Sequence, residues 1–538
     1  MPTFFPSVPD PKRKGRDNRV LNATPEGLQT LVDTMKRAHE RGATDYCLHL
    51  DDQPIGVSEG TKALFGDDYF AALWHILHEY HKAMKALDPN ATLYLLPTPY
   101  WLYAPYDAYA ETLRAAGGLP EGCGLVFCGP AVTSPAHPIA EIRRYCEAFG
   151  ATKKGLVYSN HFRHQTFHPV ERLPAELADV LIGISPEVAT ATTRATRLDW
   201  SWNPDAYDPG RSMMLAVREY AGFEHWAKVY ELVNTYVSIP PDPPELAPDT
   251  AADVCIRRLN RVGELLQEVK TLPNKGLNGR LKLPDRTPTR GFSRNLIDQM
   301  EAAYGRLNSE RFRRLIREEC FKKARAARTR AAPTLDGVLD DAVWKDAPAF
   351  GDCAAQGGRT ATVKCLYDDE NVYFGARMTP GDPITLDRAA GALGMSLPNG
   401  LTRQTGTDLR GTWDYGSWNA ISLLLDPQLT RRTAYDFQLN AAGCYADAYH
   451  CTTDPRAAGM LWNSDWTRRV VIAEDRLSWT AEIAIPWKDL HVTPKPGHIM
   501  GLQLYHTAPG GPVGRWIPDV WGAWGGRDSR RFGFLILE

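Results

Sequence analysis

The chain has 538 residues, of which 43% are apolar and 23% are charged, and its formal net charge is −2. This length exceeds one hydrophobic core and predicts two or three domains of a globular protein. The near-neutral charge offers no basic field for nucleic acid or anionic membrane, and no apolar run approaches the roughly 20 residues of a membrane span. We therefore expect neither nucleic acid nor a membrane as a partner.

The ten cysteines are scattered and contain no Cys-x-x-Cys pair, which argues against a zinc site and leaves the redox compartment open. His161 and His164 have no acidic or cysteine partner at ligand spacing, so we expect no metal and no cofactor. The first seven residues lack the apolar core of a signal peptide. As written the chain starts in the cytoplasm, whereas an N-terminus upstream of Met1 would allow a secretion signal; the oligomeric state stays open.

Residues 1–21 are rich in proline and basic residues and predict an irregular lead-in. In residues 22–193, amphipathic helical patterns alternate with short apolar runs. The first helix opens at Thr24-Pro25, a good cap followed by a good first helical residue, and stops at Gly42. Further helices are expected at 67–87, 107–116 and 139–149, and strands at 46–50, 91–96, 124–128, 155–158 and 180–184. Such alternation predicts a parallel sheet with right-handed crossovers.

About five strand–helix units precede residue 193, whereas a closed β/α barrel needs eight. The sequence therefore predicts either an open α/β sheet or a partial TIM-type barrel that lacks its first strands.

The expected strand at 46–50 ends in two adjacent carboxylates, Asp51 and Asp52. The carboxyl ends of parallel strands are where α/β barrels place catalytic groups. A solvated acidic turn is the alternative, because similar Asp pairs occur at residues 67–68, 340–341 and 368–369.

Residues 194–330 predict a helical region and linker, interrupted by prolines at 240–244. The strongly basic run at 311–330 is interpreted as a solvated helix that leads into the linker. Residues 331–538 contain short alternating strands separated by Gly, Pro and Asp turns, which is typical of an antiparallel β-sandwich.

Five short stretches of the first half resemble, in the same order, glycoside hydrolase family 84, the β-N-acetylglucosaminidases that include O-GlcNAcases. They are Leu48-His-Leu-Asp-Asp52, Leu95-Leu-Pro-Thr-Pro-Tyr100, Leu125-Val-Phe-Cys-Gly-Pro130, Leu156-Val-Tyr-Ser-Asn160 and Trp202-Asn-Pro-Asp-Ala-Tyr-Asp-Pro209. The resemblance implies removal of terminal β-linked N-acetylglucosamine from a glycan or glycoconjugate. It also implies substrate-assisted retaining catalysis, in which the sugar's own 2-acetamido oxygen attacks the anomeric carbon and forms an oxazoline.

The resemblance also implies residue roles. Asp51 matches the carboxylate that accepts the acetamido N–H and orients its oxygen, and Asp52 matches the general acid and base. The substrate-binding residues implied are Tyr100, Tyr158, Asn160 and Gln165.

Three departures from the family favour another function. Gln165 stands where the family usually has an Asp and lacks the charge that strengthens bonds to sugar hydroxyls. Ser185-Pro186 replaces a family Asn-Pro, and the first three barrel strands have no counterpart. The alternative is therefore a catalytically inactive carbohydrate-binding protein with a truncated glycosidase domain; a related barrel glycosidase with another substrate is a third hypothesis.

Residues 333–538 resemble family 9 carbohydrate-binding modules. The matching segments are Leu335-Asp-Gly-Val-Leu-Asp-Asp-Ala-Val-Trp344, Tyr367-Asp-Asp-Glu-Asn-Val-Tyr373, Leu425-Asp-Pro427, Trp479-Thr-Ala-Glu-Ile-Ala-Ile-Pro486 and Phe532-Gly-Phe534. Such modules bind sugars by stacking exposed aromatic rings on pyranose faces. The candidates here are Trp413, Trp418, Trp516, Trp521 and Trp524, although a tryptophan in a sandwich is more often a core residue.

Overall fold

The computed structural model describes the chain except for residues 10–18, 52, 54, 103, 105, 131–136, 159–166, 168, 170, 186–190, 241–244, 273–295, 351–358, 385–418, 452, 508–513 and 519–528. The chain divides into two compact units. The N-terminal unit contains Met1–Asn160 and Pro174–Glu187, and the C-terminal unit contains His161–Leu173 and most of the chain from Val188 to Glu538. None of the described helices is both long and apolar enough to cross a membrane.

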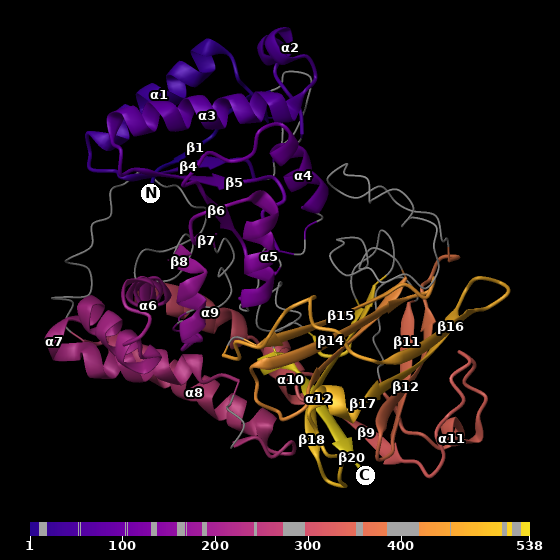
Figure 1. The fold of residues 1–538 in the computed structure, drawn as a ribbon. Coiled ribbons are helices and arrows are strands. Elements are labelled where there is room, and N and C mark those ends of the chain that lie inside the picture. Colours follow the sequence, from indigo (N-terminus) through magenta and orange to yellow (C-terminus); the bar gives the residue numbers. More distant parts are fainter. Residues whose placement is uncertain are drawn as a thin grey trace. The chain divides into compact units, whose positions relative to one another are not determined.

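The N-terminal unit is an α/β fold around a six-stranded parallel sheet in the order β1-β4-β5-β6-β7-β8 (Figure 1). The strands are β1 (Thr3–Phe4), β4 (Asp45–His49), β5 (Thr92–Leu96), β6 (Gly124–Phe127), β7 (Gly155–Tyr158) and β8 (Leu181–Ser185). The helices are α1 (Pro25–His39), α2 (Glu59–Phe65), α3 (Tyr69–Leu87), α4 (Asp107–Ala115), α5 (Ile139–Phe149) and the 3₁₀ helix η1 (Ala175–Asp179). The predicted parallel α/β arrangement is confirmed. Within the described residues β1 and β8 form the two edges of the sheet.

The first 21 residues differ from the irregular lead-in that we expected. β1 pairs in parallel with β4, and the amide of Cys47 donates a hydrogen bond to the carbonyl of Pro2 (3.1 Å). β2 (Ser7–Pro9) and β3 (Arg19–Leu21) form an antiparallel pair. Strands of two or three residues are too short to show a periodic pattern, and the prolines mark them as loop. Their structure depends on long-range pairing, which covers an otherwise open edge of β4.

Local sequence explains where the main helices begin. Thr24 caps α1 by accepting a hydrogen bond from the amide of Gly27 (3.1 Å), and Asp68 caps α3 through the amide of Ala71 (2.9 Å). α1 and α3 lie side by side (Figure 1). α3 buries one apolar stripe, made of Tyr69, Ala72, Leu73, Ile76, Leu77, Tyr80 and Met84. This stripe has the 3.6-residue spacing expected of a helix that covers a sheet.

The C-terminal unit begins with a helical region that has its own core. Its helices are α6 (Ala191–Trp202), α7 (Pro209–Val237), α8 (Ala251–Lys270), α9 (Leu296–Leu307) and α10 (Glu310–Glu318). Buried side chains from four of these helices meet in one cluster, including Val229, Leu232, Leu259, Leu265, Met300 and Ile316. For the described residues of this region, the helical prediction therefore holds up to residue 318.

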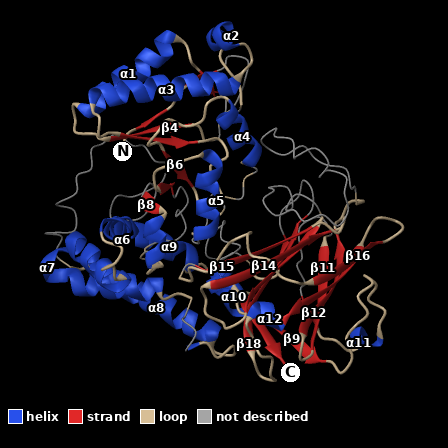
Figure 2. Cartoon of the chain, viewed as in Figure 1, coloured by secondary structure: helices blue, strands red, loops and turns tan. Residues whose placement is uncertain are grey.

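The rest of the C-terminal unit is a large curled sheet, in the order β15-β14-β13-β18-β20-β9-β11-β12-β17-β16 (Figure 2). The strands are β9 (Lys323–Arg328), β10 (Ala349–Phe350), β11 (Thr360–Tyr367), β12 (Asn371–Thr379), β13 (Ala420–Asp426), β14 (Thr433–Asn440), β15 (Tyr445–Cys451), β16 (Thr467–Ile472), β17 (Trp479–Pro486), β18 (Ile499–Thr507), β19 (Gly514–Arg515) and β20 (Gly533–Leu537). Short helices α11 (Ala342–Lys345), α12 (Trp487–Leu490) and η4 (Ser529–Arg531) lie between them.

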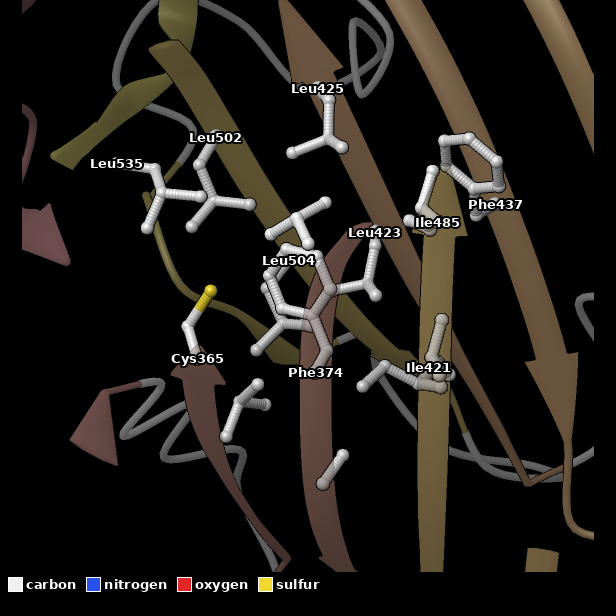
Figure 3. Close-up of a cluster of buried hydrophobic side chains, with 14 of the residues drawn as sticks. Cys365, Phe374, Ile421, Leu423, Leu425, Phe437, Ile485, Leu502, Leu504 and Leu535 are labelled. Carbon is white, nitrogen blue, oxygen red and sulfur yellow. The ribbon is translucent and has the colours of Figure 1, made fainter. Parts of the chain in front are cut away.

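The two halves of this sheet enclose one core. Cys365 and Phe374, from β11 and β12, point into the same cluster as Leu423, Leu502 and Leu535 from the other half (Figure 3). β9 joins the halves, because it pairs with both β11 and β20. Both of these pairings are parallel, while the other strand pairings among the described residues of the sheet are antiparallel. The sheet is thus mixed, and not antiparallel throughout as we expected.

β9 also corrects the interpretation of the basic run as helix and linker. Ala324 and Ala326 are buried, whereas Lys323, Arg325 and Arg328 point outward and form ion pairs. Their partners are Asp249, Glu538 and Asp369. Alanine and arginine favour helices, and only the two neighbouring strands, which local sequence does not show, make this segment a strand.

The segments that resemble carbohydrate-binding modules have a structural role at Glu482. Its buried carboxylate accepts hydrogen bonds from the amides of Asp336 (2.9 Å) and Gly337 (2.8 Å) and from the indole of Trp344 (2.7 Å). Burial raises the pKa of Glu482, and these three donors oppose that shift. Gly337 has a φ of +92°, and a side chain there would meet the Val470 backbone at 3.0 Å. The motif that contains Gly337 and Trp344 and the motif that contains Glu482 therefore attach the first turn of the β-rich region to β17.

We predict that Ala326→Leu destabilises the C-terminal unit. Ala326 is 0% exposed in the strand that joins the two halves, so a larger side chain would overpack the core, at a cost of about 1–3 kcal/mol. Thermal unfolding of this variant should show a lower midpoint than the wild type. The matched control is Arg325→Leu, one residue away and on the outer face, which should change stability by less than about 0.5 kcal/mol. Equal effects of the two variants would contradict the central position of β9.

Candidate functional site

Asp51 lies two residues after the end of β4, and little of its side chain is exposed to solvent. Nε2 of His49 contacts Oδ1 of Asp51, and the two side chains are 7% and 14% exposed. The solvated acidic turn, the alternative for this Asp pair, does not describe Asp51. A shielded carboxylate beside a histidine is a common feature of functional sites, although structural ion pairs also look like this.

Buried hydrogen bonds fix the turn that carries Asp51. The amide of Gln53 donates to the carbonyl of Leu50 (3.3 Å), and its side-chain Nε2 donates to the carbonyl of His49 (3.1 Å). From the loop after β5, the hydroxyl of Thr98 lies within reach of the carbonyl oxygens of Leu50 (3.2 Å) and Gln53 (3.4 Å). Thr98 and Gln53 are both buried. The turn that carries Asp51 is therefore held by hydrogen bonds from its own Gln53 and from Thr98 in the loop after β5.

Tyr100 lies in the loop that follows β5. Its amide donates to the carbonyl of Thr98 (3.0 Å), and its own carbonyl accepts from the amide of Cys128 (2.6 Å), just past β6. The ring is buried and packs edge-on against Trp101, with ring centroids 4.9 Å apart. Parallel pairing of His49 with Leu96 brings the loops after β4 and β5 to the same edge of the sheet.

The structure describes only part of the predicted constellation. Asp51 and Tyr100 both lie at the carboxyl edge of neighbouring strands. Tyr158 is the last residue of β7, but its side chain is not among the described ones. Asp52, Asn160 and Gln165 lie outside the described residues.

Three residues of this edge were not predicted, namely His49, Gln53 and Thr98. All three occur inside or beside the stretches that carry the family resemblance, but the resemblance implied no role for them. Period-two alternation along β4 would have placed Cys47 and His49 on one face, as the observed pairing does.

Three other described side chains of the N-terminal unit have pKa values that burial raises. Burial raises the pKa of the Cys47 thiol well above its usual range. Tyr69 and Tyr109, whose hydroxyl oxygens are 3.3 Å apart, also have raised pKa values because they are buried. These raised pKa values favour the protonated form of the Cys47 thiol and of the Tyr69 and Tyr109 phenols. In the described part of the chain, no group of three or more His, Cys, Asp or Glu residues could hold a metal ion.

Among the tryptophans proposed for sugar stacking, only Trp516 is described. It is 3% exposed, belongs to the core of the curled sheet and packs against Phe350 at a centroid distance of 5.2 Å. A ring that stacks on a sugar needs one exposed face, whereas both faces of a core ring are in contact with protein. The burial of Trp516 therefore disagrees with the predicted stacking role. The other four, Trp413, Trp418, Trp521 and Trp524, lie outside the described residues.

A row of buried polar side chains lies on the opposite face of the same sheet. Asp436 and Gln438 alternate along β14 with the core residues Tyr435, Phe437 and Leu439. Nε2 of Gln438 donates to Oδ2 of Asp436 (2.8 Å). Across the sheet, Asp436 is opposite Leu424, which in turn is opposite Gln503. Hydrogen-bonding groups on a sheet face are the kind that recognise sugar hydroxyls, but sequence alone did not distinguish these residues from ordinary strand positions.

Comparison with known proteins gives structural similarities only. No protein-family model matches the chain, and no curated protein is significantly similar to it. A family 9 carbohydrate-binding module from Caldicellulosiruptor kristjanssonii, solved in complex with glucose, is 16% identical and covers 40% of this chain and 96% of its own, with a TM-score of 0.29.

Two further structures are similar over different extents. A variant of the O-GlcNAc hydrolase of Thermobaculum terrenum is 14% identical and covers 55% of this chain and 66% of its own, with a TM-score of 0.38. A putative carbohydrate-binding protein from Bacteroides uniformis is 11% identical and covers 40% of this chain and 99% of its own, with a TM-score of 0.30. At these scores and identities, none of the three assigns a function to the chain.

We predict that Thr98→Val loosens the turn that carries Asp51. Valine keeps the shape of threonine but loses the hydroxyl, whose single proton can reach the carbonyl of Leu50 or of Gln53, so one buried hydrogen bond is lost, at a cost of about 1–3 kcal/mol. Hydrogen exchange of peptides that cover residues 48–56 should become faster. The control is Thr112→Val, because the Thr112 hydroxyl donates to the carbonyl of Ala108 (2.8 Å) on the exposed face of its own helix. Unchanged exchange in Thr98→Val would show that the turn does not depend on this hydroxyl.

Proposed function

We propose that this chain is a glycoside hydrolase that removes terminal β-linked N-acetylglucosamine by substrate-assisted retaining catalysis. The observation that carries the proposal is the shielded Asp51 at the carboxyl end of β4, in contact with His49 and on the same sheet edge as Tyr100. The sequence resemblance to family 84 gives this carboxylate its role. The proposed catalytic region spans residues 22–193, and residues 331–538 form the proposed β-sandwich carbohydrate-binding module.

The first chemical step forms the oxazoline. The acetamido oxygen of the sugar attacks the anomeric carbon while the bond from that carbon to the leaving oxygen breaks. Asp51 accepts the hydrogen bond of the acetamido N–H, which orients the amide and stabilises the positive charge that develops on it. Asp52 donates its proton to the leaving oxygen.

The second step reverses these roles. Asp52, now a carboxylate, takes a proton from water, and the water oxygen attacks the anomeric carbon. The bond between this carbon and the amide oxygen breaks, so the acetamido group is restored and the configuration is retained. Tyr100, Tyr158, Asn160 and Gln165 are the proposed contacts to the sugar.

The alternative is a carbohydrate-binding protein without turnover. It is supported by the open six-stranded sheet of the described residues and by Gln165, which replaces an acidic residue of the resembling family. The polar side chains of Asp436 and Gln438 support sugar recognition by the C-terminal unit under either function. A solved structure that resembles this part of the chain was obtained with glucose bound.

The test is hydrolysis of a fluorogenic aryl N-acetyl-β-glucosaminide by the full chain and by Asp52→Asn. Because asparagine has no acidic proton to give to the leaving oxygen, we expect kcat/KM to fall at least about 100-fold. The matched control is Asp67→Asn, which changes the first residue of another Asp pair. Asp67 is exposed and pairs with Lys62 (2.7 Å), so this variant should keep full activity.

The two functions give different results in this assay. Turnover that is lost in Asp52→Asn and kept in Asp67→Asn supports the hydrolase. A folded wild-type protein that binds N-acetylglucosamine but shows no turnover would support the binding protein. Full activity in Asp52→Asn would contradict the role proposed for Asp52.

A further inference from the structure

The N-terminal residues of the chain place an aromatic ring beside His49. β1 pairs in parallel with β4 so that Phe4 lies opposite Leu48, and the next residue, Phe5, follows the same register toward His49. The Phe5 and His49 rings stack with centroids 4.7 Å apart and an angle of 20° between their planes. Phe4 packs on the other face of the sheet, against Tyr46. The two phenylalanines thus contact opposite faces of β4.

A second short sheet holds Phe5 in place. The guanidinium of Arg19 lies 5.8 Å from the centroid of the Phe5 ring. Nε of Arg19 donates to the hydroxyl of Ser7 (3.0 Å), and Ser7 pairs with Leu21 in the antiparallel pair of β2 and β3. The Phe5 ring is nearly half exposed. Strand β1 comes just before Phe5 and strand β2 just after it, and both strands are paired, so the position of Phe5 is fixed.

The imidazole of His49 connects this ring to the carboxylate. One face of the imidazole lies on Phe5, and its Nε2 contacts Oδ1 of Asp51. Stacking restricts rotation of the imidazole plane, so the direction of its Nε2–H bond is also restricted. Because Oδ1 of Asp51 contacts His49, we assign the hydrogen bond from the amide N–H of the substrate to Oδ2. A carboxylate that must orient a substrate group benefits from this kind of fixed partner.

We propose that His49 is a positioning residue for Asp51 and that Phe5 fixes the plane of its imidazole. The inference rests on the function proposed for Asp51, and it assigns to the N-terminal residues a part in that site. His49 does not touch the reacting atoms. It acts by holding the rotamer of the carboxylate that accepts the acetamido N–H.

The kinetic test compares His49→Leu with His49→Gln in the full chain. Leucine removes the N–H donor, and we expect kcat to fall on the order of 100-fold while KM changes little, because the interaction with the amide strengthens as the oxazoline forms. Glutamine places an N–H donor near the position of Nε2 and should restore most of the loss. Equal losses in both variants would show that packing, and not the donor, is what the site needs, and would overturn the proposal.

Phe5→Ala tests the aromatic contact. We expect a smaller loss of kcat in the same direction as in His49→Leu. The matched control is Phe65→Ala, because Phe65 packs against a different histidine, His75, with centroids 5.2 Å apart. The control should keep wild-type kcat, and equal effects of the two alanine variants would overturn the role of Phe5.

A spectroscopic test separates this inference from the function it rests on. In protein with ¹⁵N-labelled histidine, the His49 signal is identified by its loss in His49→Leu. We expect Nε2 of His49 to carry a proton and its shift to change in Asp51→Asn and Phe5→Ala but not in Phe65→Ala. An unprotonated Nε2, or a signal insensitive to Asp51→Asn, would overturn the positioning role whether or not the enzyme is active. If the spectra are as expected but the protein shows no turnover, the contact between His49 and Asp51 stands, and only its role in catalysis is overturned.

Discussion

The parallel pairing of β4 with β5 is the constraint on which the candidate site depends. Because both strands run in the same direction, the turn that carries Asp51 and the loop that carries Thr98 and Tyr100 end at one edge of the sheet. Buried hydrogen bonds then tie the two segments together, from Thr98 to the carbonyls of Leu50 and Gln53. A shielded carboxylate is costly unless it is partnered, and His49 supplies that partner.

The C-terminal unit depends in a similar way on one strand. β9 pairs with β11 on one side and β20 on the other, so it turns two antiparallel halves into one curled sheet around a shared core. The segments that resemble carbohydrate-binding modules maintain this fold, as the hydrogen bonds around Glu482 illustrate. The polar side chains of Asp436 and Gln438 lie on the opposite face of β14 from this core and are hydrogen-bonded to each other.

Sequence patterns correctly predicted those elements that are determined by residues close together in the chain. The helix caps Thr24 and Asp68 and the apolar runs of β4 to β8 are defined by neighbouring residues, and they lie within one or two residues of where we expected them. β1 and β9 were missed, because the first is too short for a pattern and the second consists of helix-forming residues that only distant strands hold extended. For the site, the position of Asp51 could be predicted, but His49 and Phe5 could not, because their contact requires two segments more than 40 residues apart.

The central claim is that the substrate's own acetamido group is the nucleophile and that Asp51 orients it. The most direct measurement compares kcat/KM for aryl glycosides that share one leaving group but carry an acetamido, a monofluoroacetamido or a trifluoroacetamido group at C2. Fluorine withdraws electrons from the amide oxygen, so we predict a steep fall in kcat/KM along this series, and a shallower one in Asp51→Asn. Equal rates for the three substrates would contradict participation of the amide and would assign any turnover to a nucleophile on the protein.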